Sequence, residues 1–155
     1  MYKRQIADCM FVDSEPRMKK GTVGCAALDM CGNLAAGTST GGLTNKKFGR
    51  VGDTSIIGAG TYANNATVAV SCTGNGEEFI RYGVAKDVHN LLYYRNMSLQ
   101  QAADEVIHGG RLRPDDGGLI AVDKDGNIAY ACNSDVLFRG GANSDGLFEV
   151  FLWMD

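Results

Sequence analysis

Two threonines, Thr22 and Thr40, are the side chains whose spacing most directly suggests chemistry. A predicted three-residue turn, Met30-Cys31-Gly32, separates two small-residue strands, and its glycine suits the left-handed position of such a turn. Asp29 then faces Asn33, and counting back along both strands places Thr22 opposite Thr40. Directly opposed side chains share one face of a sheet, with Cβ atoms roughly 4.5–5.5 Å apart. The sequence therefore predicts that the side chains of Thr22 and Thr40 are neighbours on one face of the sheet.

The threonine pair has a simpler interpretation as well. Thr38 is expected on the same face, and cross-strand threonine pairs commonly do no more than stabilise a sheet. Taken alone, the pattern favours that structural role.

Two charged residues in a glycine-rich loop form a second candidate site. Arg50 and Asp53 flank Val51-Gly52. An arginine fork can bind a carboxylate through two bonds, and an aspartate can hold an ammonium group. Together they could bind both charged ends of an α-amino acid. The alternative is a solvated loop ion pair that contributes little.

The segment Thr73-Gly74-Asn75-Gly76 leads directly into a predicted helix that begins near Glu77. Backbone N–H groups at such a glycine-rich entrance can stabilise an anion or a developing oxyanion. The alternative is an ordinary helix start. The glycines at 58 and 60 resemble part of a dinucleotide fingerprint, but the following residues predict a turn and a strand where that motif requires a helix.

Composition narrows the possible classes of protein. The chain has 155 residues, 45% hydrophobic and 21% charged, with a net charge of −3. This is typical of one globular domain and argues against a nucleic-acid-binding protein. No membrane span or signal peptide is evident, so a cytoplasmic protein is expected. Five cysteines without a Cys-x-x-Cys motif, and only two histidines, predict no metal site, no cofactor and no disulfide framework.

The predicted elements that position these residues form an α+β fold. Residues 1–21 carry a net charge of +2 and are expected to be an irregular tail, whereas 22–155 form the folded domain. Strands are expected at 22–29, 33–40, near 55–60 and at 66–73. One helix is expected from 77 to 94 and another from the capping box at Ser98 to Gly109. Residues 121–129 repeat the pattern of the first hairpin, and together these elements indicate an antiparallel sheet with helices layered on it.

Four motifs in this order and spacing resemble one known group of proteins. The chain resembles the β subunit of the plant-type asparaginase/isoaspartyl peptidase family of N-terminal-nucleophile hydrolases over residues 18–155. The motifs that carry the resemblance are Gly21-Thr22-Val23-Gly24, Gly37-Thr38-Ser39-Thr40-Gly41-Gly42, Gly49-Arg50-Val51-Gly52-Asp53 and Thr73-Gly74-Asn75-Gly76.

The resemblance implies that Thr22 is the nucleophile and that the precursor cleaves itself at Gly21-Thr22. The α-amino group released on Thr22, with an ordinary pKa of about 7.7–8, would act as the base for its own hydroxyl. Thr40 would hydrogen-bond that hydroxyl. The implied fold is the four-layer αββα sandwich.

The remaining motif residues acquire roles by the same resemblance. Arg50 is expected to bind the substrate α-carboxylate and Asp53 its α-ammonium group. Thr73 and the N–H of Gly74 are expected to form the oxyanion hole, and Gly76 a further substrate contact. The implied reaction is hydrolysis of the side-chain amide of L-asparagine, or of the isoaspartyl bond of β-aspartyl peptides, through a β-aspartyl-Thr22 ester.

Particular residues distinguish the plant-type asparaginase family from related branches of the superfamily. Asp53 argues against the threonine-aspartase branch, whereas a glycosylasparaginase-type amidase resembles the same motifs and usually differs at the second glycine of Gly41-Gly42. Residues 1–21 are similar to the end of the family's α subunit, so an α-subunit partner and homodimerisation to an (αβ)2-like assembly are expected. A catalytically silent or aspartate-binding half that needs this partner is the second interpretation.

Overall fold

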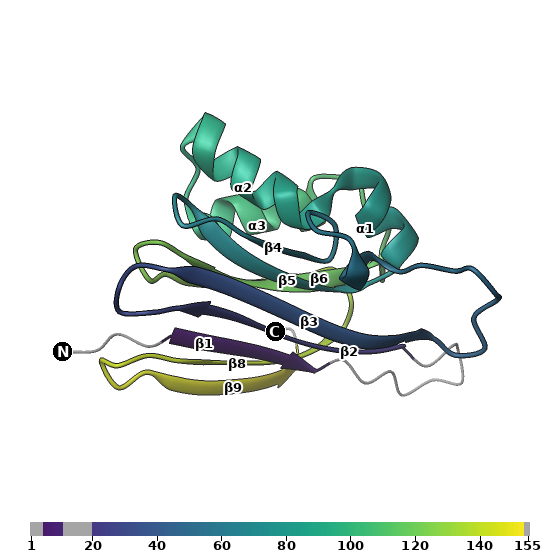
Figure 1. Cartoon of the computed structure of the whole chain (residues 1–155), viewed down its shortest axis with the longest axis horizontal. Helices are drawn as coiled ribbons and strands as arrows, with labels where there is room; N and C mark the ends of the chain where they lie inside the picture. Colours follow the sequence, from purple (N-terminus) through teal and green to yellow (C-terminus); the bar gives the residue numbers. More distant parts are fainter. Residues whose placement is uncertain (1–4, 11–19, 154–155) are drawn as a thin grey trace.

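Two antiparallel sheets stacked face to face form the centre of the molecule (Figure 1). The computed structural model describes residues 5–10 and 20–153, with only the backbone described for 5–10 and 20. One sheet has the strand order β3-β2-β1-β8-β9 and the other the order β4-β5-β6-β7. The strands are β1 (Gln5–Met10), β2 (Lys20–Leu28), β3 (Leu34–Leu43), β4 (Thr61–Ala63), β5 (Val68–Gly74), β6 (Gly117–Asp123), β7 (Ile128–Cys132), β8 (Val136–Ala142) and β9 (Phe148–Trp153).

Three helices cover the outer face of the four-stranded sheet (Figure 1). They are α1 (Gly76–Tyr82), α2 (Val84–Arg95) and α3 (Leu99–His108). The α+β class is therefore confirmed, and the described residues form three layers: helices, sheet and sheet. Within this part of the chain, no helix has the length and hydrophobicity needed to cross a membrane.

The β2–β3 hairpin has the predicted register. Thr22 pairs with Thr40, and the ladder shifts between Gly21 and Thr22. Gly32 has the left-handed φ of 82° that the turn requires. One Asp29 carboxylate oxygen accepts bonds from the backbone N–H groups of Cys31 and Asn33, at 2.8 Å each. This side chain fixes the turn and therefore the register of the threonines.

The same turn occurs again in the other hairpins. Asp123 accepts bonds from the backbone N–H groups of Asp125 and Asn127, which confirms the predicted repeat. Asn143 does the same with Asp145 and Leu147 in the β8–β9 hairpin. This third copy was not predicted from the sequence, because an asparagine replaces the aspartate at its first position.

The expected helix from 77 to 94 is wrong, since the structure divides it into α1 and α2 at Gly83. Gly83 has φ 59° and ψ 45°, a left-handed conformation that ends one helix and begins the next. The capping box at Ser98 is confirmed: its side chain accepts from the backbone N–H of Gln101, whose side chain accepts from the backbone N–H of Ser98. Gly109 follows the last residue of α3.

Two further element predictions need correction. No strand forms at 55–60; instead a 3-10 turn, Asp53–Ser55, leads into a tight loop in which Gly60 N–H donates to the carbonyl of Asp53. Residues 5–10, expected to be irregular, form β1 between β2 and β8. Hydrogen bonds to β2 and β8 stabilise this strand, and the local composition of residues 5–10 does not indicate them. Residues 11–19 of the expected tail lie outside the described part.

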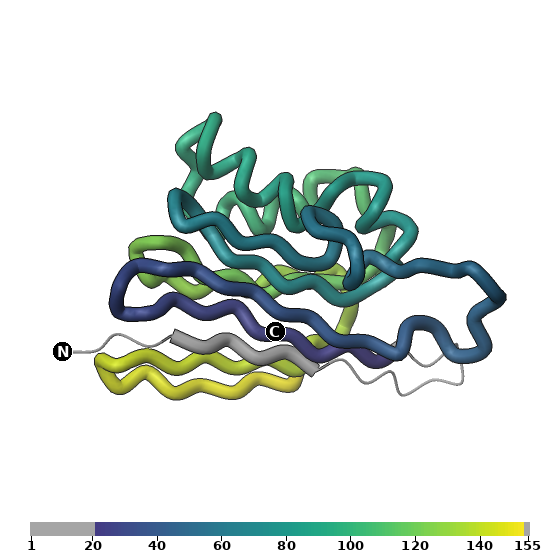
Figure 2. Tube along the Cα trace, in the orientation of Figure 1, coloured from purple at the N-terminus to yellow at the C-terminus, as the bar shows by residue number. Residues whose placement is uncertain are grey.

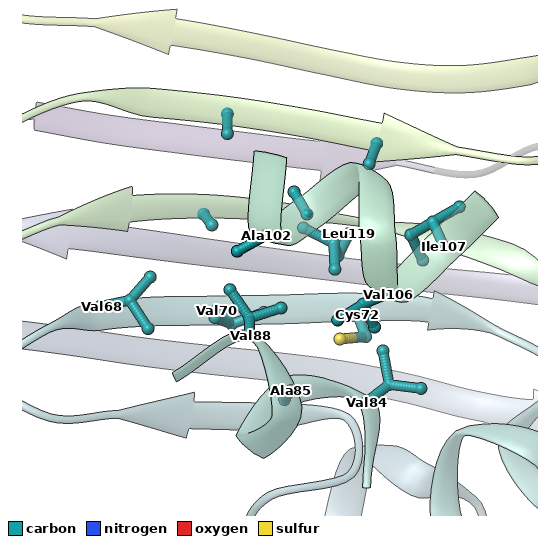
Figure 3. Packing of buried hydrophobic residues seen from close by; sticks show 14 of the residues in the cluster. Val68, Val70, Cys72, Val84, Ala85, Val88, Ala102, Val106, Ile107 and Leu119 are labelled. Atoms are coloured by element: carbon teal, nitrogen blue, oxygen red, sulfur yellow. The ribbon is translucent and has the colours of Figure 1, made fainter. Parts of the chain in front are cut away.

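The main core lies between the four-stranded sheet and the helices. Figure 3 shows side chains from β5 meeting side chains from α2 and α3, and the buried residues labelled there are Val68, Val70, Cys72, Val84, Ala85, Val88, Ala102, Val106, Ile107 and Leu119. A second layer lies between the two sheets, where alanines and a valine (Ala26, Ala69 and Val122) pack with two leucines (Leu28 and Leu34). This layer lets strands of the two sheets approach closely.

The glycine-rich loop between β3 and the 3-10 turn projects past one end of the sheets (Figure 2). It begins after Leu43, and the 3-10 turn at its end contacts α1. The fold therefore gathers all four sequence motifs at one end of the stacked sheets.

Candidate active site at the end of the sheet sandwich

The hydroxyls of Thr22 and Thr40 form a directed chain that ends on the backbone of Gly21. Thr22 Oγ1 donates to Thr40 Oγ1 at 3.1 Å, and Thr40 Oγ1 donates to the carbonyl oxygen of Gly21 at 2.8 Å. The backbone N–H of Gly42 donates to Thr40 Oγ1 at 2.9 Å. The contact predicted from the hairpin register is confirmed. The Thr40 hydroxyl thus accepts a hydrogen bond from the Thr22 hydroxyl and, by its own donation, polarises the carbonyl group that precedes Thr22.

A second pair of hydroxyls, those of Thr38 on β3 and Ser71 on β5, links the two sheets. Thr38 Oγ1 lies 2.7 Å from Ser71 Oγ, and it donates to the carbonyl oxygen of Gly60 at 3.3 Å. Gly24, opposite Thr38 in the hairpin, is buried, and a Cβ built on it would lie 1.9 Å from Ser71 Oγ. The sequence did not identify Ser71 as a site residue. Its position two residues before Thr73 on one strand would have placed it on the same face of the sheet as Thr73.

We expect Gly24→Ala to lower the free energy of unfolding by about 2–3 kcal/mol, because the new methyl group overlaps the Ser71 hydroxyl. In a Ser71→Ala background the same substitution should cost about half as much, since the overlapping oxygen is gone. Urea titrations of the four proteins measure this. Equal costs in the two backgrounds would contradict the close approach of the two sheets.

Thr73 and Gly74 end β5 against the loop that precedes β6. Thr73 is buried, and its Oγ1 has no hydrogen-bond partner among the described residues. A Cβ on Gly74 would lie 2.0 Å from the carbonyl oxygen of Asp116. The backbone N–H of Asn75 donates to that oxygen at 2.6 Å, and its Nδ2 donates to the Asp116 carboxylate at 3.2 Å. Asp116, which sequence reasoning missed, therefore holds the Thr73–Gly76 turn in place.

Arg50 does not pair with Asp53 in the loop, so the sequence interpretation as a solvated pair of these residues is wrong. Its guanidinium instead makes two bonds to Glu77, at 2.8 and 3.0 Å. Asp53 is only 6% exposed, and Gly76 lies against both residues: a Cβ there would be 2.9 Å from Asp53 Oδ1 and 3.1 Å from Arg50 Nη2. Glu77 was considered only as a residue of the first helical turn.

Asp53 is a buried carboxylate with an incomplete set of partners. Its Oδ2 accepts no hydrogen bond from the described residues. Burial raises the pKa of Asp53 to about 6, and the charge of Glu77 adds to that effect while Arg50 opposes it. A buried carboxylate in this state gains from a cationic partner, so this site favours an ammonium group. No group of three or more histidine, cysteine or acidic side chains among the described residues could hold a metal ion.

With this geometry in view, comparisons with known proteins are informative. A family model described as Asparaginase matches residues 2–152. The chain belongs to the asparaginase family. This confirms the family indicated by the four sequence motifs.

Several relatives in this family are similar over most of the chain. An isoaspartyl peptidase of Escherichia coli K12 is 51% identical over 131 residues, which cover 81% of this chain and 39% of the relative. A probable isoaspartyl peptidase/L-asparaginase 2 of Arabidopsis thaliana is 50% identical, covering 85% and 40%. A plant-type L-asparaginase of Pyrococcus furiosus is 44% identical, covering 77% and 39%. The chain thus spans about two fifths of the length of these relatives.

The asparaginase-family fold brings every residue of the sequence-predicted site to one end of the two sheets. Thr22 and Thr40 come from the β2–β3 hairpin, Thr73 and Gly74 from β5, and Arg50 from the loop between them. Asp53, the first residue of the 3-10 turn, lies against Gly76, the first residue of α1. The arrangement places the Thr22 hydroxyl, a cation, an anion and the buried Thr73 hydroxyl, which has no partner among the described residues, within one region.

Proposed function

We propose that this chain carries the nucleophile of an amidohydrolase that acts on the side-chain amide of L-asparagine and on the isoaspartyl bond of β-aspartyl peptides. The observation that carries the proposal is the chain of bonds from the Thr22 hydroxyl through Thr40 to the Gly21 carbonyl oxygen. The names of the relatives, isoaspartyl peptidase and L-asparaginase, support the substrate class.

The first step of the proposed mechanism is self-cleavage at Gly21-Thr22. Thr22 Oγ1 attacks the carbonyl carbon of Gly21 while Thr40 donates to the carbonyl oxygen. The C–N bond breaks, the nitrogen of Thr22 takes the proton that Oγ1 gives up, and a Gly21–Thr22 ester remains. Water then hydrolyses the ester, which yields a Gly21 carboxylate and a Thr22 with a free α-amino group.

The free α-amino group then serves as the base for hydrolysis of the substrate. It accepts the Thr22 hydroxyl proton as Oγ1 attacks the side-chain carbonyl carbon of the substrate. The buried Thr73 hydroxyl, to which the described residues offer no hydrogen-bond partner, and the N–H of Gly74 stabilise the developing oxyanion. The amine leaves with the transferred proton, a β-aspartyl-Thr22 ester forms, and water releases aspartate.

Recognition of the substrate's charged end is assigned to Arg50 and Asp53. The half-buried guanidinium of Arg50 binds the α-carboxylate, and the buried carboxylate of Asp53 binds the α-ammonium group. Gly76, which has no side chain to block the approach, completes this side of the pocket. Two features of the Asp53 carboxylate support this assignment: its Oδ1 lies on the Gly76 side, and its Oδ2, buried against Gly60, accepts no hydrogen bond from the described residues.

We expect binding of L-aspartate to weaken as the pH falls through about 6, because Asp53 must be ionised to hold the ammonium group. The raised pKa places this loss above the ordinary range of a carboxyl group, and affinity should then fall by up to about tenfold for each further pH unit. Isothermal titration calorimetry between pH 4.5 and 8 measures this. An Asp53→Asn variant should bind weakly at every pH, and an unchanged profile in that variant would refute the assignment.

We also propose that this portion works with a partner α subunit in an (αβ)2-like assembly. The outer face of the five-stranded sheet carries exposed apolar side chains, among them Phe148, Val150 and Leu152. None of the helices in the described residues covers that face (Figure 1). A helical layer from the α subunit there would complete the αββα sandwich, and residues 1–21, with β1, would be the end of that subunit.

A reducing cytoplasm is the proposed location. The four cysteines whose side chains are described form no disulfide with one another. A cytoplasmic amidohydrolase would keep such thiols reduced.

The proposal is tested with the 155-residue chain, alone and with the α subunit added. Intact mass over several days at neutral pH reports loss of residues 1–21, and aspartate release is followed with L-asparagine, a β-aspartyl dipeptide and, as control, the matching α-aspartyl dipeptide. Cleavage followed by release from the first two substrates only is expected. An uncut chain that binds L-aspartate without turnover would instead support the aspartate-binding interpretation.

A further inference from the structure

The guanidinium of Arg50 is held along one edge by Glu77, the second residue of α1. Nε donates to Oε1 at 2.8 Å and Nη2 donates to Oε2 at 3.0 Å. Arg50 is the more buried partner, with 15% of its side chain exposed against 48% for Glu77. Two parallel bonds to a carboxylate fix the plane of a guanidinium as well as its position.

The adjacent edge of the same guanidinium, formed by Nη1 and Nη2, lies among three glycines. A Cβ on Gly42 or on Gly52 would lie 3.0 Å from Nη1, and one on Gly76 would lie 3.1 Å from Nη2. Gly42 is also the residue whose N–H donates to Thr40 Oγ1. Within the described part of the chain, Nη1 makes no hydrogen bond. The Nη1–Nη2 edge is therefore close to the threonine pair and able to accept a second carboxylate.

We propose that Glu77 is a positioning residue that makes the site selective for ligands with an α-carboxylate. It holds the Nε–Nη2 edge of Arg50 so that the Nη1–Nη2 edge faces the substrate. The inference rests on the proposed function, because it assigns Arg50 to the α-carboxylate. It goes further by naming the residue that sets the orientation of that arginine.

The geometry separates this role from competition between Glu77 and the ligand. A competing carboxylate would occupy the edge that faces the substrate, whereas Glu77 occupies the edge that faces α1. Removal of a competitor strengthens ligand binding, and removal of a positioning residue weakens it. The sign of the change therefore decides between the two.

The ionisation of Asp53 makes the prediction selective. Although Glu77 contributes to the raised pKa of Asp53, that pKa is about 6, so at pH 7.5 Asp53 is ionised with or without Glu77 and its bond to an ammonium group should persist in Glu77→Gln. Loss of Glu77 should thus weaken only that part of binding that depends on the carboxylate. A general disturbance of the fold would weaken both parts.

The first experiment needs no ligand. The ¹⁵N–¹H signal of the Arg50 Nε is assigned in the 155-residue chain by its loss in Arg50→Lys. In Glu77→Gln this signal should shift and its hydrogen should exchange faster with water. An unchanged signal would overturn the proposal. Asp125→Asn is the matched control, because it removes one negative charge from an exposed carboxylate at the far end of β6.

The second experiment measures binding of two probes at pH 7.5 by calorimetry. For L-aspartate, Glu77→Gln should weaken binding about tenfold, the effect of losing one charge-assisted contact that orients the arginine. For the α-amide of L-aspartic acid, which lacks the α-carboxylate, the affinity should not fall. Asp125→Asn should match the parent protein with both probes.

The outcomes distinguish this proposal from the proposed function. If the parent binds L-aspartate and Glu77→Gln binds it equally well or more tightly, the positioning role is overturned and the proposed function stands. If both probes weaken equally, selectivity for the carboxylate is overturned. If the parent binds no L-aspartate, the proposed function fails and the positioning role fails with it.

Discussion

Replacing Thr22 with alanine is expected to leave a single uncut chain of full mass and to abolish aspartate release, with a loss of at least about 10³-fold in both reactions. The methyl group of alanine cannot attack the Gly21 carbonyl, which the Thr40 hydroxyl polarises. Intact mass spectrometry measures the first reaction and an assay of released aspartate the second.

Two matched variants make the Thr22 result specific. Thr22→Ser keeps the hydroxyl and should cleave. Thr40→Val keeps the shape of the side chain but removes its bonds to Thr22 and to the Gly21 carbonyl, so cleavage should slow by about 10²-fold. Cleavage of Thr22→Ala at the parent rate would show that another group attacks the bond, and the proposed function would be wrong.

The hairpin that positions these hydroxyls could be predicted from the sequence because its information is local. The turn at 30–32 is fixed by Gly32 and by the Asp29 carboxylate, so register follows from counting residues. Alternation along a strand then determines which residues share a face. This local information is sufficient to predict that Thr22 and Thr40 lie opposite one another, without any family resemblance.

The interactions that the sequence did not predict join distant segments. Arg50 and Asp53 are predicted as a substrate-binding pair, with a loop ion pair as the alternative, but the sequence does not indicate that the fold brings Glu77 to Arg50 and buries Asp53 beside Gly76. Ser71 meets Thr38 only because the two sheets stack. No periodicity along one segment encodes such contacts, since they depend on which elements pack together.

The position of β1 and the break at Gly83 show two further limits of local patterns. The charged composition of residues 1–21 predicts an irregular tail. Residues 5–10 nevertheless form β1, because they pair with β2 and β8. Apolar residues keep helical spacing across Gly83, and therefore a continuous helix was predicted. The left-handed conformation of this glycine, which redirects the chain, is invisible to a hydrophobic pattern.

Replacing Gly74 with alanine is expected to lower the free energy of unfolding by about 3–5 kcal/mol, the sum of overpacking and an unfavourable backbone conformation. Its φ of 156° is unusual for a residue with a side chain, and the new methyl group would lie 2.0 Å from the Asp116 carbonyl oxygen. Because that oxygen accepts the Asn75 N–H, the Thr73–Gly76 turn must move away from it.

The control for Gly74 is a glycine at which an added methyl group would contact no other atom. Gly37 lies in β3, and a Cβ built on it meets no atom within 4 Å. Gly37→Ala should therefore change stability by less than about 1 kcal/mol. Urea titrations with equal m-values compare the two variants. If both had the same small effect, the contact between β5 and the Asp116 loop would not be as close as described. A large loss confined to Gly74 would instead show that the backbone proposed to stabilise the oxyanion depends on the absence of a side chain at this position.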